Sequence, residues 1–108
     1  MPTLTIGGKN VEWHHISNYH GINDNKHNPN GKITSMRTES LSGCLAWVFN
    51  QNPSYSVEFI STKNVHGNNC FAKTATRQQA RADGTWEFWP GSKWLFYDPL
   101  PVDATVQI

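Results

Sequence analysis

Residues 86–97 have the sequence WEFWPGSKWLFY, in which two aromatic runs flank a Pro-Gly pair. Proline presets φ and glycine accepts a positive φ, so this pair suits the centre of a type II turn. Successive residues of a strand point to opposite faces of a sheet, which places Trp94 and Phe96 on one face and Tyr97 on the other. The stretch therefore predicts a β-hairpin with one aromatic face in the core.

Short segments of the same kind recur along the chain, separated by residues that favour turns. The candidates are residues 4–6, 11–16, 33–37, 45–49, 56–60 and 104–108. Residues 7–10 (GGKN) form a hairpin-like break between the first two. Residues 45–49 (LAWVF) place their largest apolar side chains at alternate positions, as in a half-buried strand. The best helix signal covers residues 72–82, which contain good helix formers but no apolar stripe.

This pattern predicts an all-β fold, a small Greek-key β-sandwich or compact barrel with at most one short helix. A length of 108 residues suits a single β domain over residues 1–108. The expected core consists of Leu45, Trp47, Phe49, Val57, Phe59, Phe88 and Phe96.

The charge and hydropathy patterns argue against two classes of partner. The formal net charge is +1 and the basic residues are scattered, so no basic run exists that would neutralise several phosphates of a nucleic acid. No apolar run approaches the ~18 residues that a membrane span needs. The first ten residues lack the pattern of a secretory signal. A secreted protein whose leader has been removed is slightly favoured over a cytosolic one.

Two cysteines, Cys44 and Cys70, allow one disulfide. The alternative is a pair of buried free thiols. Two cysteines do not by themselves assign a compartment.

The motifs of several common enzyme classes are missing from the sequence. The chain contains no G-x-S-x-G, no P-loop, no H-E-x-x-H and no dinucleotide fingerprint. Glu58, His66 and Arg77 can imitate the acid–base set of a small ribonuclease, but this trio is one of many that could be chosen. We therefore predict a protein that binds rather than catalyses.

Aromatic and polar residues near the end of the chain predict a binding surface. If one aromatic face belongs to the core, Trp89 and Tyr97 can be exposed together. An exposed ring can stack on the apolar face of a sugar while neighbouring polar groups bind its hydroxyls, and Trp and Tyr also suit protein contacts. The leading prediction is a lectin-like, carbohydrate-binding protein that contacts a glycan or a protein surface through Trp89, Tyr97, Asp98 and Lys93.

Asn-rich loops provide a second hypothesis, a metal site. Asn23, Asp24 and Asn30 carry the hard oxygen donors that calcium prefers, which makes calcium the candidate cofactor. His20 and His27 together with Asp24 could instead hold zinc or copper. The alternatives are a solvated turn and ordinary surface histidines.

Residues 13–21 (WHHISNYHG) resemble the aromatic hairpin of βγ-crystallin domains, and residues 30–35 (NGKITS) are similar to the calcium loop of that family. The resemblance implies a Greek-key sandwich with one weak calcium site near Asn30 and Ser35. A structural, weakly calcium-binding βγ-crystallin-like protein is therefore the second functional prediction, and a small secreted toxin or inhibitor is the third.

The same part of the chain shows a possible internal repeat. Residues 11–38 and 47–74 share several aromatic, Asn and Gly positions at an offset of 36 residues, among them Trp13 with Phe49. Similarity of this period suggests two related β units.

Overall fold

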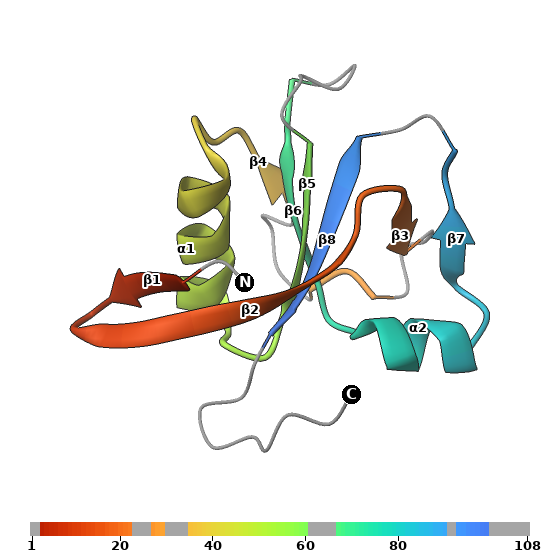
Figure 1. The fold of residues 1–108 in the computed structure, drawn as a ribbon, viewed down its shortest axis with the longest axis horizontal. Coiled ribbons are helices and arrows are strands. Elements are labelled where there is room, and N and C mark those ends of the chain that lie inside the picture. Colours follow the sequence, from red (N-terminus) through yellow and green to blue (C-terminus); the bar gives the residue numbers. More distant parts are fainter. Residues whose placement is uncertain (1–2, 23–26, 30–34, 61–66, 91–92, 100–108) are drawn as a thin grey trace.

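The structure is a computed structural model that describes residues 3–22, 27–29, 35–60, 67–90 and 93–99. Its larger sheet contains β1 (Thr3–Ile6), β2 (Lys9–Ser17), β8 (Trp94–Pro99), β5 (Ser56–Ile60), β6 (Cys70–Lys73) and β4 (Ser35–Met36), in that spatial order. A separate ribbon pairs β3 (His20–Ile22) with β7 (Trp86–Phe88), and the helices are α1 (Leu41–Gln51) and α2 (Arg77–Ala82) (Figure 1).

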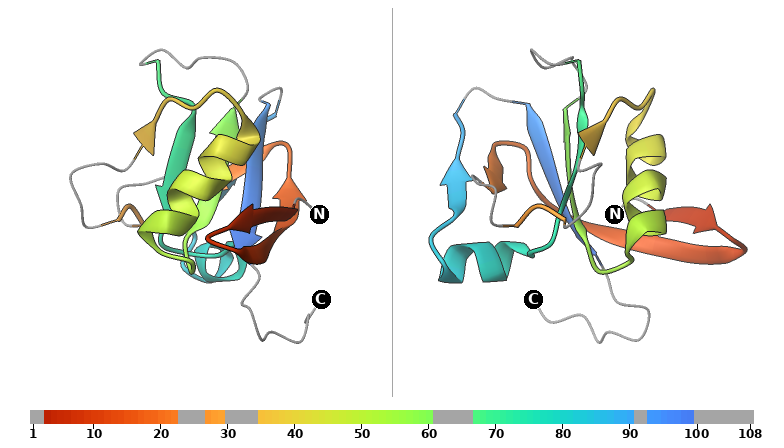
Figure 2. Two further views of the ribbon diagram at one scale, coloured as in Figure 1. Left: turned by 90° about the vertical axis from the view of Figure 1, so that its left-hand side faces the viewer. Right: turned by 180° about the vertical axis from the view of Figure 1, so that it is seen from behind.

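The larger sheet is antiparallel and curls into a half-barrel. Figure 2 shows α1 on one side of this sheet, and the β3–β7 ribbon with α2 on the other side. The predicted compact all-β fold is confirmed, although the described residues include two helices rather than one. Neither of these helices is long and apolar enough to cross a membrane.

The first hairpin forms where the sequence predicts it. Gly7 and Gly8 connect β1 to β2 and have φ angles of 58° and 82°. A two-residue type I′ turn matches the twist of the strands and has positive φ at both positions, and glycine adopts this conformation without steric cost.

Residues 45–49 belong to α1, so the predicted strand at this position is wrong. The helix begins after Ser40, whose side-chain oxygen accepts a hydrogen bond from the Gly43 N–H at 3.1 Å. The buried residues Cys44, Leu45 and Val48 recur at helical spacing and form its inner stripe. In the internal repeat suggested by the sequence, Phe49 lies in a helix whereas its counterpart Trp13 lies in β2, so these two positions do not belong to equivalent strands.

A disulfide joins Cys44 of α1 to Cys70 of β6, with the two Cα atoms 5.4 Å apart. Both cysteines are fully buried in the larger apolar cluster. Of the two alternatives that the sequence left open, the disulfide is therefore the one in the structure, and it ties α1 to the sheet.

Alternation along the strands creates two different cores. The α1 side holds the larger cluster, which includes Val57, Phe59 and Tyr97, whereas Phe96 belongs to a smaller cluster on the opposite side. The predicted core residues Leu45, Val57, Phe59 and Phe96 are buried, and Trp47 and Phe49 are partly buried against the larger cluster. Phe88 was wrongly assigned to the core, because its side chain is 61% exposed.

The predicted hairpin of residues 86–97 does not form either. The first aromatic run becomes β7, which pairs with β3, and the second becomes β8, which lies between β2 and β5. The predicted helix is confirmed only in its second half, because residues 70–73 form β6 and α2 begins at Arg77.

Candidate functional site

An open hollow of about 400 Å³ lies where the end of β2, the β3–β7 ribbon and α2 meet. We call it the α2 hollow, and its lining consists of Ile16, Ser17, His20, Arg77, Arg81 and Trp86. The lining combines a hydroxyl, an imidazole and two guanidinium groups with two apolar walls. The volume of the hollow lies in the range of small-ligand sites, but the hollow is open and its lining is more polar than is usual for such sites.

Four rings form an aromatic row beside the α2 hollow: Phe96, Trp86, His20 and Phe88. Trp86 packs edge-on against the buried Phe96 at a centroid distance of 4.8 Å. His20 stacks on Trp86 at 5.1 Å with an interplanar angle of 5°, and it contacts Phe88 at 5.1 Å. The row therefore runs from the core to the exposed ring of Phe88 and is rigid at its inner end.

Pairing between β3 and β7 produces this row. His20 lies directly opposite Phe88 in the antiparallel register, and Trp86 precedes Phe88 by two residues on the same face. Tyr19, next to His20 in sequence, is 48% exposed and accepts a backbone hydrogen bond from the Trp89 N–H at 2.6 Å. Two exposed rings thus lie at the outer end of the ribbon.

A hydrogen bond with Ser17 orients His20. The Oγ atom of Ser17 lies 2.6 Å from Nδ1 of His20 and accepts a second hydrogen bond from the Tyr19 N–H at 3.0 Å. The direction of the Ser17–His20 hydrogen bond depends on the tautomer of the histidine. In either neutral tautomer, Nε2 of His20 lies on the ring edge away from Ser17 and is a donor or an acceptor.

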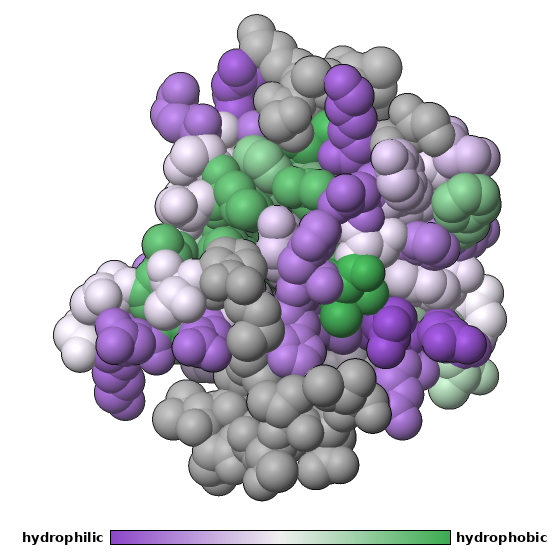
Figure 3. Space-filling view, in the orientation of Figure 1, coloured by the Kyte–Doolittle hydropathy of each residue, from purple (hydrophilic) through white to green (hydrophobic). Residues whose placement is uncertain are grey.

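The two arginines lie one turn apart on α2, so their side chains extend from the same face of the helix. Both side chains are exposed. Among the described residues, neither guanidinium group has a carboxylate oxygen within 4.0 Å. Figure 3 shows the most hydrophilic surface gathered over α2 on this face of the molecule.

Asp98 anchors the start of α2. Its carboxylate accepts hydrogen bonds from the Arg77 backbone N–H at 3.1 and 3.3 Å and from the Ser56 hydroxyl at 3.1 Å. Burial raises the pKa of Asp98 above its ordinary value, and these hydrogen bonds and the positive charge of Arg77 oppose the rise. A capping box between Thr76 and Gln79 completes the helix start.

The structure separates two residues that were expected to be exposed together. Tyr97 is only 5% exposed and lies in the cluster on the α1 side, where its ring contacts His15 at 5.0 Å. Trp89 is half-buried against Gly21, and its indole N–H donates to the Glu87 carboxylate at 3.0 Å. A shared exposed surface of Trp89 and Tyr97 is therefore wrong, because Tyr97 points to the other side of β8.

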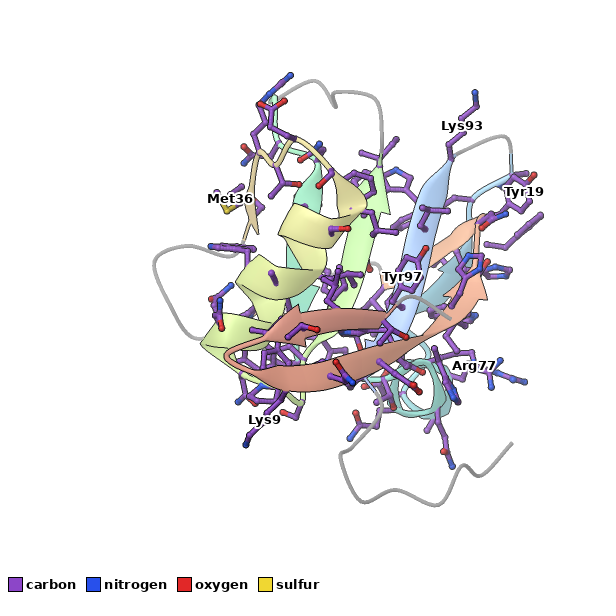
Figure 4. All side chains as sticks on the ribbon, turned by 60° about the vertical axis from the view of Figure 1, so that its left-hand side comes forward. Lys9, Tyr19, Met36, Arg77, Lys93 and Tyr97 are labelled. Atoms are coloured by element: carbon purple, nitrogen blue, oxygen red, sulfur yellow. A yellow bond between two sulfur atoms is a disulfide. The ribbon has the colours of Figure 1, made fainter. Side chains whose placement is uncertain are left out.

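The remaining predicted ligand contacts lie far from each other along β8. Lys93 is exposed and immediately precedes this strand, whereas Asp98 is near its end and hydrogen-bonded to α2. Figure 4 labels Lys93, Tyr97 and Arg77 at three separate places. Their predicted role in ligand binding stays a prediction.

The predicted metal ligands Asn23, Asp24 and Asn30 lie outside the described residues. Ser35 is described, and its hydroxyl oxygen accepts a hydrogen bond from the Asn68 amide at 2.9 Å. Nε2 of His27 lies 2.6 Å from the Asp83 carboxylate. Within the described ranges, no group of three or more His, Cys, Asp or Glu side chains could hold a metal ion.

Only two members of the trio suggested for ribonuclease-like chemistry, Glu58 and Arg77, lie in the described part of the chain. Glu58 is 4% exposed and accepts a hydrogen bond from the Ile22 backbone N–H at 2.8 Å. Arg77 lies at the α2 hollow, and His66 is outside the described residues.

Sequence reasoning missed the α2 hollow, although one signal was present. Arg77 and Arg81 are four residues apart in a predicted surface helix without Asp or Glu between them. Such spacing places two positive charges on one helix face, where they repel unless a negative group joins them. No protein-family model, no curated protein and no solved structure matches this chain.

Proposed function

We propose that this protein is a non-catalytic binding module for a carbohydrate, and that the ligand occupies the α2 hollow and contacts the exposed end of the aromatic row. The observation that carries the proposal is the lining of the hollow, where the wall formed by Trp86 adjoins the polar groups of Ser17 and His20 and the arginines of α2. A sugar offers the matching chemistry, because its C–H face packs on a ring and its hydroxyls accept hydrogen bonds.

The exposed ring of Phe88 supports the same proposal. A large apolar side chain that is 61% exposed beside a polar hollow gains from being covered by a ligand. Stacking on such a ring buries apolar area without fixing the ligand's orientation, while the donors of the hollow determine which hydroxyls are recognised.

A binding role suits the Ser17–His20 pair better than catalysis. The two residues are three positions apart in one turn, and their hydrogen bond uses Nδ1 of the histidine. A catalytic serine needs a base that is itself oriented by a third group. Among the described residues, His20 has ring contacts with Trp86 and Phe88 but no hydrogen-bonded carboxylate.

The disulfide supports a secreted protein. Disulfides form and persist in oxidising compartments and are rare in the cytosol. The Cys44–Cys70 bond is buried and joins a helix to the sheet, as expected of a structural disulfide.

A glycan array tests the proposal, once with calcium and once with a chelator. We expect binding in both conditions, and we expect Phe88→Ala to weaken it about tenfold through lost stacking. Phe88→Tyr is the matched control because it keeps the ring, and it should bind like the parent protein. Binding only with calcium would instead favour the calcium-binding prediction, and no glycan binding in either condition would overturn the proposal.

A further inference from the structure

We infer that the α2 hollow selects an acidic saccharide, one that carries a carboxylate or a sulfate group. This inference rests on the proposed carbohydrate function and adds the chemical class of the ligand. Its basis is the pair Arg77 and Arg81, which line the hollow together with His20.

Neither guanidinium group forms a salt bridge in the described part of the chain, where no carboxylate oxygen lies within 4.0 Å of either group. Asp83 is close in sequence to Arg81, but its carboxylate oxygen lies 2.6 Å from Nε2 of His27. Two positive charges one turn apart on a helix repel each other, and an anion bound between them would remove that repulsion.

Among the described residues, Asp98 attracts Arg77, but its carboxylate already accepts hydrogen bonds from the Arg77 backbone N–H and the Ser56 hydroxyl. These bonds hold the helix in place. Neither guanidinium group forms a hydrogen bond with another described side chain, so its N–H donors can bind a ligand. A planar guanidinium matches a carboxylate or a sulfate with two parallel hydrogen bonds.

The arginines extend from a helix that is fixed to the rest of the molecule. Ala80, between them on α2, is fully buried, and its carbonyl accepts a hydrogen bond from the Thr85 N–H at 2.9 Å. Nε2 of His20 adds a polar group to the same lining. With the helix in place, the ordering that binding requires is limited to the two exposed arginine side chains.

The shape of the site favours an acidic sugar over a bare inorganic anion or a nucleic acid. A hollow of about 400 Å³ is larger than a single sulfate, and the aromatic row beside it offers a surface for a sugar ring. A net charge of +1 leaves the two arginines as a local feature rather than part of an extended basic surface.

Calorimetric titration with matched pairs of tetrasaccharides tests the inference. The probes are tetragalacturonate against its methyl ester, and a sulfated carrageenan tetrasaccharide against its desulfated form. At least one acidic member should bind about tenfold more tightly than its uncharged counterpart, and high salt should weaken only the acidic member.

Variants of the two arginines then test whether the preference for the acidic tetrasaccharide depends on Arg77 and Arg81. Arg77→Gln and Arg81→Gln should each weaken binding of the acidic member about tenfold and leave the uncharged member unchanged. Arg37→Gln is the matched control, because Arg37 is exposed and distant along the chain from the hollow, and it should bind like the parent. Unchanged melting temperatures in all three variants will show that folding is intact.

The outcomes separate this inference from the proposed function. Equal affinity for acidic and uncharged members would overturn the acidic selectivity and leave carbohydrate binding in place. Failure of all four tetrasaccharides, together with a silent glycan array, would overturn both. Equally tight binding of a short single-stranded oligonucleotide would also overturn the inference, since it would indicate attraction to any polyanion.

Discussion

On the α1 side of the sheet β5 contributes Val57 and Phe59, whereas on the opposite side the same strand contributes Ser56 and Glu58, both buried. The α1 side is an apolar cluster closed by a disulfide. The opposite side uses polar side chains as anchors for the backbone of neighbouring elements. One sheet thus combines a face that stabilises the fold with a face that positions a site.

Three hydrogen bonds make up the polar anchors. Glu58 accepts from the Ile22 N–H at 2.8 Å and so holds β3, and the Ser56 hydroxyl donates to the Ala75 carbonyl at 2.7 Å. Asp98 accepts from the Arg77 N–H and holds α2. Because β3 carries His20 and α2 carries both arginines, these anchors determine the geometry of the α2 hollow.

The largest expected effect is on the α1 side. Replacing both Cys44 and Cys70 by alanine should lower the free energy of unfolding by about 3–4 kcal/mol, because the unfolded chain is no longer restrained by the cross-link. Urea denaturation measures this loss. If the two sides are separate in function, saccharide affinity measured well below the melting temperature should be unchanged. A variant that stays folded but loses binding would contradict this separation.

A somewhat smaller effect is expected for Glu58→Leu on the opposite side. The Ile22 N–H would lose its buried acceptor, which should cost about 2–3 kcal/mol of stability. Unlike loss of the disulfide, this change should also weaken binding, because β3 would lose the anchor that positions His20. Glu58→Gln keeps an acceptor oxygen and serves as the control. If Glu58→Leu binds the saccharide as tightly as Glu58→Gln does, the hydrogen bond to the Ile22 N–H is not needed for binding.

The smallest effect concerns Asp98 and pH. Because burial raises the pKa of folded Asp98 above its ordinary value of 3.8, the folded protein holds this proton more tightly than the unfolded chain does. The resulting stabilisation is complete below pH 3.8 and is lost as the pH rises through the raised pKa. The Asp98→Asn variant has no carboxyl group at this position, so it does not lose this stabilisation as the pH rises. Its amide oxygen can still accept the hydrogen bond from the Arg77 N–H.

Melting curves of both proteins between acidic and neutral pH test this prediction. The melting temperature of Asp98→Asn should rise relative to the parent as the pH increases, and saccharide binding at neutral pH should persist. A relative fall in the same pH range would mean that ionised Asp98 stabilises the folded state.

Local sequence patterns predicted those features that depend on a few neighbouring residues. The Gly7-Gly8 turn and β5 lie where they were expected, and Phe96 and Tyr97 point to opposite sides of β8 as alternation requires. These features depend on backbone preferences of a few residues, which a single sequence contains.

Helix α1 was mistaken for a strand because a short apolar run fits both periods. Leu45, Trp47 and Phe49 alternate, yet Leu45 and Val48 also share a face with Cys44 at helical spacing. The capping by Ser40 was the signal that favours the helix.

The α2 hollow could not be predicted because its parts are far apart in the sequence. Its lining comes from the end of β2, from β3, from α2 and from β7, and the β3–β7 pairing that brings His20 next to Trp86 links distant segments. The Pro-Gly pair suggested that residues 86–97 would pair with each other. Both aromatic runs instead pair with other strands, which depends on the packing of the whole chain.

The most direct test of ligand binding at the α2 hollow is the response of tryptophan indole N–H resonances in NMR spectra during titration with the acidic tetrasaccharides. Trp86 lines the α2 hollow, whereas Trp13 and Trp47 lie in or against the apolar cluster on the α1 side. We expect the Trp86 resonance to shift progressively while those of Trp13 and Trp47 stay in place. A shift of the Trp13 or Trp47 resonance with Trp86 unchanged would place the ligand on the other side of the sheet and contradict binding at the α2 hollow.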